Sequence, residues 1–281
     1  MTAGLAREPL GRGAPAGGGR LAGLGRRAAD LTPAFVVFVV VVVVWEVGLT
    51  VAGVQQFLLP RPSVILGALV EGWPILQRGV VYTGFEALGG LIIGVGLGVS
   101  AAFATARWAT AREALMPIAV GASSVPILAL APITSSWFSA ESPLSRIAIV
   151  TLMVFFPILV NTVRGLTTID PAALELMRSY AASDVAILTK LRIPNALQFF
   201  FTALRIAATL AVIGAVIGEY FGGPRYALGI FITSEAYVFR YPSAWAGILL
   251  ACLLGIAFYL AVLALERLVI PWQSGQRRPD G

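Results

Sequence analysis

The sequence predicts an all-α integral membrane protein with six transmembrane helices, and three observations carry that prediction. The mean hydropathy is +0.87, and only 12% of the 281 residues are charged, against roughly 25% in a soluble domain. Several mostly apolar runs reach about 20 residues, the length that crosses about 30 Å of hydrocarbon. These runs do not alternate apolar with polar residues, as the strands of a membrane barrel would.

Six spans are expected in one membrane domain, residues 33–270. They cover residues 33–54, 80–105, 115–133, 145–166, 196–218 and 244–265. Pro126 and Pro132 break the third span, and the segment after the fifth span, 219–243, is expected to be a loop. A 10-residue amphipathic piece within 55–79 is too short to span and is expected to lie at the membrane interface.

The positive charges orient these spans. If the N-terminus is cytoplasmic, only five of the 20 Arg and Lys residues fall outside: Arg61, Arg78, Arg146, Arg225 and Arg240. Cytoplasmic segments of membrane proteins carry the excess of Arg and Lys, so both termini are predicted to be cytoplasmic. Residues 1–32 would form a disordered tail, because they are rich in Gly and Arg, and residues 271–281 a second tail.

The charged and reactive side chains argue against nucleic-acid binding, metal binding and catalysis. The net charge of +6 could suit nucleic acid, but the basic residues lie between apolar spans instead of forming a patch with aromatics. The chain has no histidine and one cysteine, Cys252, inside an apolar run. The commonest metal ligand and general base are therefore missing, and we expect no catalysis, no metal and no cofactor.

One charged segment, ELMRSYAASDVAILTKLRIP at 175–194, is out of character with this apolar chain. Asp170 followed by Pro171 predicts a helix start, and Ser183 predicts a second N-cap. The spacing therefore predicts a helix-turn-helix elbow over 170–194, with its second helix ending before Pro194 restarts the chain as the fifth span.

Each elbow helix is expected to have an apolar side and a charged side. The apolar faces would hold Ala172 or Ala173, Leu176, Met177, Tyr180, Val185, Leu188, and Leu191 or Ile193. The other side would hold Glu175, Arg178 and Ser179, with Asp184, Lys190 and Arg192 at the ends of the second helix. The elbow is either an amphipathic connector on the lipid headgroups or a docking site for a cytoplasmic partner protein.

The elbow resembles the EAA signature of permease subunits of bacterial ABC importers, written E-A-A-x-x-x-G, nine residues, then I-x-L-P. Glu175 takes the Glu position, and the end of the signature falls in register on Leu191, Arg192, Ile193 and Pro194. Other stretches, such as LLPRPSVILGAL and RIPNALQFFFTALRIA, resemble the branch for nitrate, sulfonates, taurine, and pyrimidine or riboflavin-type precursors.

The sequence departs from that family at several positions. Leu176 and Met177 replace the two alanines, and Ala181 stands where Gly would serve the turn between the elbow helices. Ser139 stands where Gly often follows a Trp-Phe pair, and Glu86 where many relatives have a basic residue.

The resemblance implies a type I importer fold with several partners. Two permease copies, expected as a homodimer, would form the pathway in the bacterial inner membrane, in contact with lipid. A periplasmic or lipid-tethered protein would deliver a small nutrient, and an ABC ATPase dimer would bind the ATP and receive the elbow. The coupling residues would be Glu175, Leu176, Met177, Arg178, Ser179, Ala181, Asp184, Leu191, Ile193 and Pro194. The alternatives are a stand-alone secondary transporter, which lacks support from an internal repeat, and a membrane-embedded enzyme.

Several residues within the spans have two interpretations. Gly90, Gly94 and Gly98 form overlapping G-x-x-x-G units, for packing within the subunit or for the dimer seam. Glu86 either pairs inside the bundle or faces the pathway, and Glu219 is expected to reach the headgroup region. Around the broken third span, pathway lining is considered for Ser123, Ser124, Pro126 and Pro132.

Overall fold

The computed structural model describes residues 19–123 and 125–271, and the regular elements within them are all helices. The chain divides into two units, residues 1–54 and 55–281. The first unit contains α1 (Gly19–Val51), with Pro33 inside the helix. The helix therefore includes residues 19–32 of the predicted tail, while the rest of that tail and residues 272–281 lie outside the described residues.

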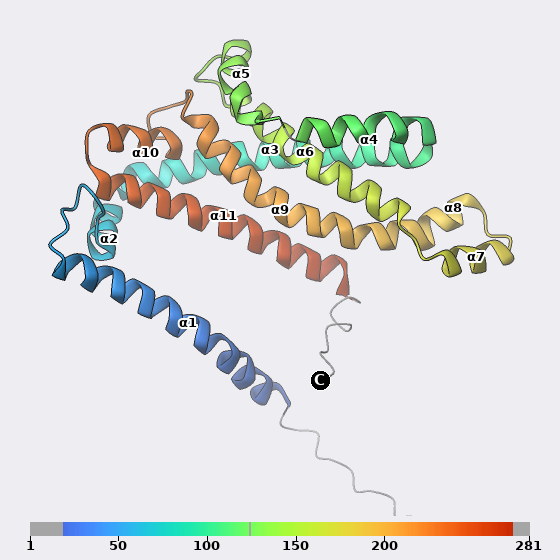
Figure 1. Ribbon diagram of the computed structural model, residues 1–281, viewed down its shortest axis with the longest axis horizontal. Helices are drawn as coiled ribbons and strands as arrows, with labels where there is room; N and C mark the ends of the chain where they lie inside the picture. Colours follow the sequence, from blue (N-terminus) through green and yellow to red (C-terminus); the bar gives the residue numbers. More distant parts are fainter. Residues whose placement is uncertain (1–18, 124, 272–281) are drawn as a thin grey trace, which may run out of the picture. The chain divides into compact units, whose positions relative to one another are not determined.

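The second unit holds the remaining helices (Figure 1). In chain order they are α2 (Pro62–Glu71), α3 (Trp73–Arg107), α4 (Ala109–Ser123), the 3-10 turn η1 (Ile127–Leu130), α5 (Ala131–Phe138), α6 (Pro143–Thr167), α7 (Pro171–Ser179), α8 (Asp184–Ile187), the π-turn η2 (Leu188–Arg192), α9 (Ile193–Glu219), α10 (Leu228–Tyr237) and α11 (Tyr241–Val269).

Five helices in the described part of the chain are long and apolar enough to cross a membrane. They are Thr32–Val51, Trp73–Ala106, Pro143–Thr167, Asp184–Glu219 and Tyr241–Val269, and they match five of the six predicted spans. The predicted third span is divided into α4, η1 and α5. Pro126 precedes η1 and Pro132 stands in the first turn of α5, as expected for a residue that cannot continue a helix.

Two shorter helices test the predictions between the spans. α2 has 10 residues and follows Pro60-Arg61, so the short helix expected within 55–79 is confirmed. The prediction of a loop over 219–243 is partly wrong, because this segment contains α10. The N-cap residue of α10 is Ala227, whose side chain makes no capping hydrogen bond. The local sequence therefore contains no signal for the start of this helix.

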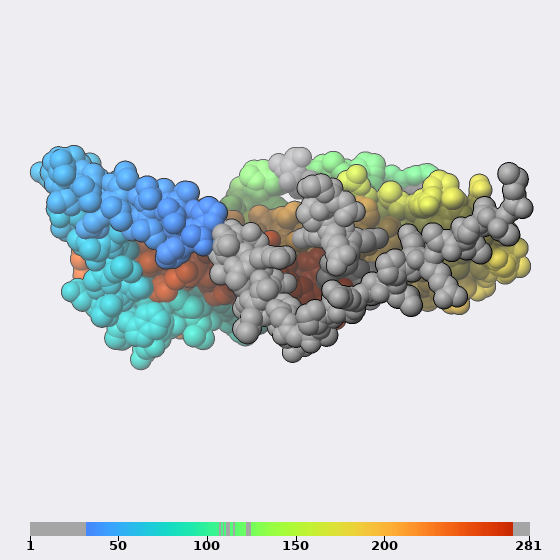
Figure 2. All heavy atoms as spheres, turned by 90° about the horizontal axis from the view of Figure 1, so that it is seen from below, coloured from blue at the N-terminus to red at the C-terminus, as the bar shows by residue number. Residues whose placement is uncertain are grey.

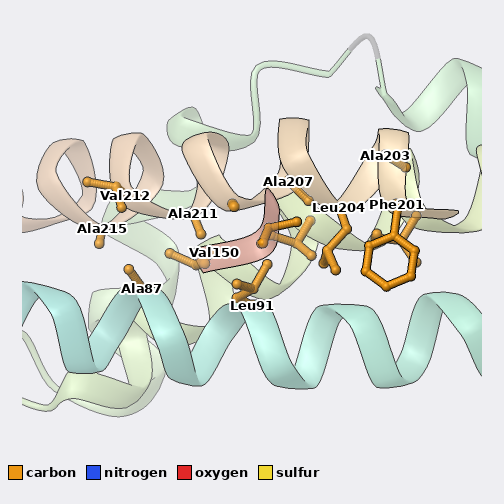
Figure 3. Close-up of a cluster of buried hydrophobic side chains, with 14 of the residues drawn as sticks. Ala87, Leu91, Val150, Phe201, Ala203, Leu204, Ala207, Ala211, Val212 and Ala215 are labelled. Atoms are coloured by element: carbon orange, nitrogen blue, oxygen red, sulfur yellow. The ribbon is translucent and has the colours of Figure 1, made fainter. Parts of the chain in front are cut away.

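The core of the second unit lies between α3, α6 and α9. On α9, the alanines Ala203, Ala207, Ala211 and Ala215 are fully buried, and Figure 3 shows Ala207, Ala211 and Ala215 on the side of α9 that faces Ala87 and Leu91 of α3. Small side chains let helix backbones approach closely, which drives helix association in lipid. The core is therefore a three-helix contact built on small residues.

The glycines of α3 form the contact with α6. A Cβ added at Gly94 would lie 2.8 Å from the carbonyl oxygen of Thr151 and 2.8 Å from Cβ of Val154. At Gly98 it would lie 2.8 Å from Cγ2 of Ile158. Packing within the subunit, the first of the two interpretations of this motif, is what the structure shows.

Replacing Gly94 with Val is expected to lower the free energy of unfolding by about 1–3 kcal/mol, because the added carbons overlap the backbone of α6. Gly96, two residues on, has no atom within 4 Å of the position of a Cβ, so Gly96→Val should change stability by less than about 0.5 kcal/mol. Denaturant titration of both variants in detergent measures the difference. Equal losses would contradict the assigned contact.

Candidate functional site

Both caps predicted for the elbow (residues 170–194) are confirmed. Asp170 precedes α7, and its Oδ1 accepts a hydrogen bond from the backbone N–H of Ala172 at 3.0 Å. Ser183 precedes α8, and its Oγ accepts from the N–H of Ala186 at 3.3 Å. Each side chain satisfies a backbone donor that the first helical turn leaves unpaired.

The turn between α7 and α8 places Ala181 in the left-handed region, with φ of +50°. The N–H of Ala181 donates to the carbonyl of Arg178 at 2.9 Å, and the N–H of Ala182 donates to the carbonyl of Met177 at 3.0 Å. This is the Schellman arrangement that usually ends on Gly. The departure from the family pattern therefore changes the residue but not the turn.

Ser139, the other departure at a Gly position, also has a positive φ, of 72°, directly after α5. A Cβ in such a conformation is strained by about 1–2 kcal/mol. Both positions where the resemblance asks for Gly thus have backbone geometry that favours Gly.

Ala181→Gly is expected to raise the local stability of the elbow turn by about 1 kcal/mol, since Gly removes the strain of the left-handed residue. Ala182→Gly is the matched control: Ala182 has no positive φ, so Gly there should lower stability by about 0.5–1 kcal/mol through the unfolded chain. Amide hydrogen exchange of α7 measures both changes, and a loss of protection in Ala181→Gly would show that the turn is not strained.

The structure of residues 184–194 shows that one prediction about the elbow is wrong. The helix does not end before Pro194 but continues from Asp184 through η2 into α9, ending at Glu219. Proline lacks an N–H and its ring crowds the preceding turn, and the wider π-turn at Leu188–Arg192 accommodates it. The second helix of the elbow is therefore continuous with α9, and the turn at 180–183 joins α7 to it.

Asn195 fixes the base of the elbow, a role that the sequence analysis missed. Its Nδ2 donates to the carbonyl of Gly165 at 2.7 Å and to the carbonyl of Thr168 at 2.8 Å, both at the end of α6. A Cβ on Gly165 would lie 2.7 Å from Cα of Ala196, so α6 and α9 cross closely here. The sequence feature that could have indicated this role is an Asn directly after the Pro of the signature.

The predicted apolar faces of the elbow are only partly buried. Of the predicted face residues, Met177, Leu188, Leu191 and Ile193 are half-buried. Ile187, which was not predicted on a face, is buried. Three predicted face residues are instead exposed: Leu176 at 58%, Tyr180 at 80% and Val185 at 69%. Alongside them Glu175, Arg178, Ser179 and Asp184 are exposed as expected. The elbow therefore presents a mixed apolar and charged surface at the far end of the second unit from α10 (Figures 1 and 2).

The broken third span borders a small apolar cavity. A cavity of about 270 Å³ lies between residues 125–128, α6 and α9, and its lining includes Pro126, Met153, Phe156 and Leu210. Pro132 is exposed. The side chain of Ser123 and the whole of Ser124 lie outside the described residues. Among the candidates for pathway lining, Pro126 thus lies at this cavity.

Glu86 lies inside the bundle, in an ion pair that the sequence analysis did not predict. Its Oε1 accepts from Nε of Arg146 at 2.9 Å, and both side chains are fully buried. Arg146 also donates to the hydroxyl of Tyr82 and to the carbonyl of Ala140. Pairing inside the bundle, one of the two interpretations of Glu86, is therefore what the structure shows. Arg146, counted among the outer charges, is not at the surface.

Glu219 was expected to reach the headgroup region, and that expectation is wrong. The side chain is fully buried; its Oε1 accepts from the hydroxyl of Thr83 at 2.7 Å and its Oε2 from the N–H of Gly229 at 2.6 Å. Thr83 in turn accepts from the N–H of Leu228 at 3.2 Å. These two side chains cap the N-terminus of α10, where an acidic group is electrostatically favourable.

Comparisons with known proteins agree on one kind of protein. The family described as binding-protein-dependent transport system inner membrane component matches residues 94–271. The formylaminopyrimidine transport permease protein of Halalkalibacterium halodurans is 33% identical over 244 residues, 85% of this chain and 95% of that protein. The riboflavin transport system permease protein of Chloroflexus aurantiacus is 28% identical over 244 residues, 85% of this chain and 89% of that protein.

A solved structure has the same fold. It is a chain from a crystal structure of an amino acid ABC transporter with histidines, with a TM-score of 0.57 and 14% identity over 70% of this chain and 95% of that chain. At that identity the likeness concerns the fold alone. It agrees with the helical membrane architecture predicted from the sequence.

Proposed function

Because the chain belongs to the binding-protein-dependent transport system inner membrane component family, we propose that it is the permease subunit of an ABC importer whose separate ATPase docks on the elbow. The family consists of multi-pass membrane transport proteins and not of enzymes. The observation in this chain that carries the proposal is the geometry of its elbow.

The elbow has the properties of a docking element. It is capped at both helix starts, tied to α6 by Asn195 and continuous with α9. A force on its second helix would therefore be transmitted directly to α9, a helix of the core. Its exposed Leu176, Tyr180 and Val185 supply apolar anchors beside charged groups, the composition of a helix that lies in a partner's groove.

The energy source has to lie in another protein. The sequence contains no phosphate-binding loop of the G-x-x-x-x-G-K-[ST] type. We therefore assign ATP binding to a partner ATPase dimer, with both termini and the elbow on the cytoplasmic side. A second copy of this chain and a separate substrate-binding protein complete the proposed assembly.

For the substrate we propose a small heterocyclic nutrient of the pyrimidine-precursor or riboflavin type. The two relatives described above are named for such compounds. The cavity beside the broken third span is lined by Met153, Phe156 and other apolar side chains, which suits a flat, weakly polar ring better than sulfonate, taurine or nitrate.

Reconstitution in proteoliposomes tests the proposal. The chain, combined with its proposed ATPase and binding protein, should take up the binding protein's ligand only when ATP is supplied. The chain alone should show no hydrolysis and no uptake driven by a proton or sodium gradient. Gradient-driven uptake without ATP would favour the secondary transporter instead.

A further inference from the structure

The buried polar cluster (Tyr82, Thr83, Glu86, Arg146 and Glu219) holds one oxygen without a hydrogen-bond donor. Glu86 Oε1 accepts from Arg146, and each oxygen of Glu219 accepts one hydrogen bond, from Thr83 and from Gly229. Glu86 Oε2 is buried and has no donor among the described residues. A buried carboxylate oxygen without a donor is costly, so this atom calls for an explanation.

The charges of the cluster point to the same atom. The cluster holds two buried carboxyl groups and one guanidinium, which pairs with Glu86, and the start of α10 adds a partial positive charge at Glu219. The two carboxyl groups lie close together, because Thr83, which donates to Glu219, stands one helical turn before Glu86 on α3. Two carboxylates at such a separation, away from water, repel each other strongly unless one of them is protonated.

We propose that Glu86 and Glu219 bind one proton between them, carried on Glu86 Oε2 and donated to the carboxylate of Glu219. The neutral acid then accepts from Arg146 with one oxygen and donates to Glu219 with the other. The cluster then holds one positive side chain, Arg146, and one negative side chain, Glu219. Glu86 Oε2 no longer lacks a hydrogen-bond partner, because it is itself the donor. A single proton would thus join α3 to α9 and to the start of α10.

The other titratable groups around the pair are tyrosines. The hydroxyl of Tyr82 accepts from Arg146 Nη2 at 3.0 Å and also interacts with Glu86, and its ring contacts the ring of Tyr226. Burial, with the negative charge of Glu219 adding to it, raises the pKa of the neighbouring Tyr220. From α6 only Arg146 enters the cluster. Tyr82 is therefore the rival source of a proton for Glu86 Oε2.

The proposal makes stability depend on pH in a defined direction. In the unfolded chain both carboxyl groups ionise with their ordinary pKa of about 4.3, so above that pH the folded chain binds one proton more. The unfolding equilibrium constant should then rise about tenfold per pH unit until the folded pair loses its proton. Alkaline pH should loosen this end of the second unit first.

The test uses the full-length chain in lipid nanodiscs. At neutral pH the infrared spectrum should contain the C=O band of a protonated carboxylic acid, and the apparent melting temperature should fall between about pH 5 and about pH 9. Glu86→Gln, whose amide can accept from Arg146 and donate to Glu219, should fold, lack the band and lose most of the pH dependence. The exposed Glu141→Gln is the matched control and should keep both.

Three outcomes would overturn the proposal. The first is the absence of the acid band in the wild-type chain, which needs no variant to fold. The second is persistence of the band in Glu86→Gln, and the third is an unchanged pH dependence in that variant. A wild-type chain without the band, together with a destabilised Tyr82→Phe variant, would assign the missing donor to the phenol.

Discussion

Replacing Arg146 with Met is expected to lower the free energy of unfolding by about 3–5 kcal/mol, because it removes the one positive side chain of the buried polar cluster and leaves the negative charge shared by Glu86 and Glu219 uncompensated. The guanidinium donates to Glu86 Oε1, to the Tyr82 hydroxyl and to the carbonyls of Ala140 and Glu141. All four acceptors would lose a donor at once, and at the fully buried Glu86 water cannot easily replace it.

Two further variants separate the charge effect from a general effect of substitution in α6. Arg164→Met makes the same change at an exposed position of the same helix and should alter stability by less than about 0.5 kcal/mol. The double variant Glu86→Met with Arg146→Met should recover part of the loss, since apolar side chains can replace Glu86 and Arg146 while Glu219 keeps its donors Thr83 and Gly229. Denaturant titration in detergent measures all three, and equal losses for Arg146 and Arg164 would refute the assigned role of the pair.

The parts of this fold that the sequence predicts are those decided locally. Hydropathy over about 20 residues located the five long spans, and the caps Asp170 and Ser183 located the elbow. The left-handed turn at Ala181 followed from the position of Gly in the family signature. In each case the decisive residues are near neighbours in the chain.

The buried polar cluster could not be found in that way. Glu86 and Arg146 are 60 residues apart, and Thr83 and Glu219 are 136 apart. From the sequence, Arg146 looked like a surface charge and Glu219 like a headgroup contact. α10 was missed for the same reason, because its N-terminus is capped by side chains from α3 and α9 instead of by its own N-cap residue.

The continuity of the elbow with α9 also depended on more than local sequence. Pro194 normally argues for a helix boundary, and the prediction followed that rule. In the structure the π-turn at Leu188–Arg192 takes up the proline, and Asn195 holds the helix against the end of α6. This tertiary support outweighs the local preference and keeps residues 184–219 in one continuous helix.

Glu175→Lys is expected to abolish ATP-driven uptake while leaving the amount of folded protein in the membrane unchanged. Glu175 is exposed on α7, so the substitution disturbs folding by no more than about 0.5 kcal/mol, the effect of a like-charge pair with Arg178. At a docking interface, reversing a charge next to apolar anchors is expected to cost about 2 kcal/mol or more, about a 30-fold loss of affinity for the ATPase.

The measurement compares uptake and ATPase co-purification for Glu175→Lys and for Glu71→Lys, the same change at an exposed position at the end of α2. Only Glu175→Lys should lose both uptake and co-purification of the ATPase, since only the elbow is proposed to contact the ATPase. Normal co-purification combined with lost uptake would mean that Glu175 acts after docking. Wild-type uptake by Glu175→Lys, at wild-type protein levels, would remove α7 from the proposed interface.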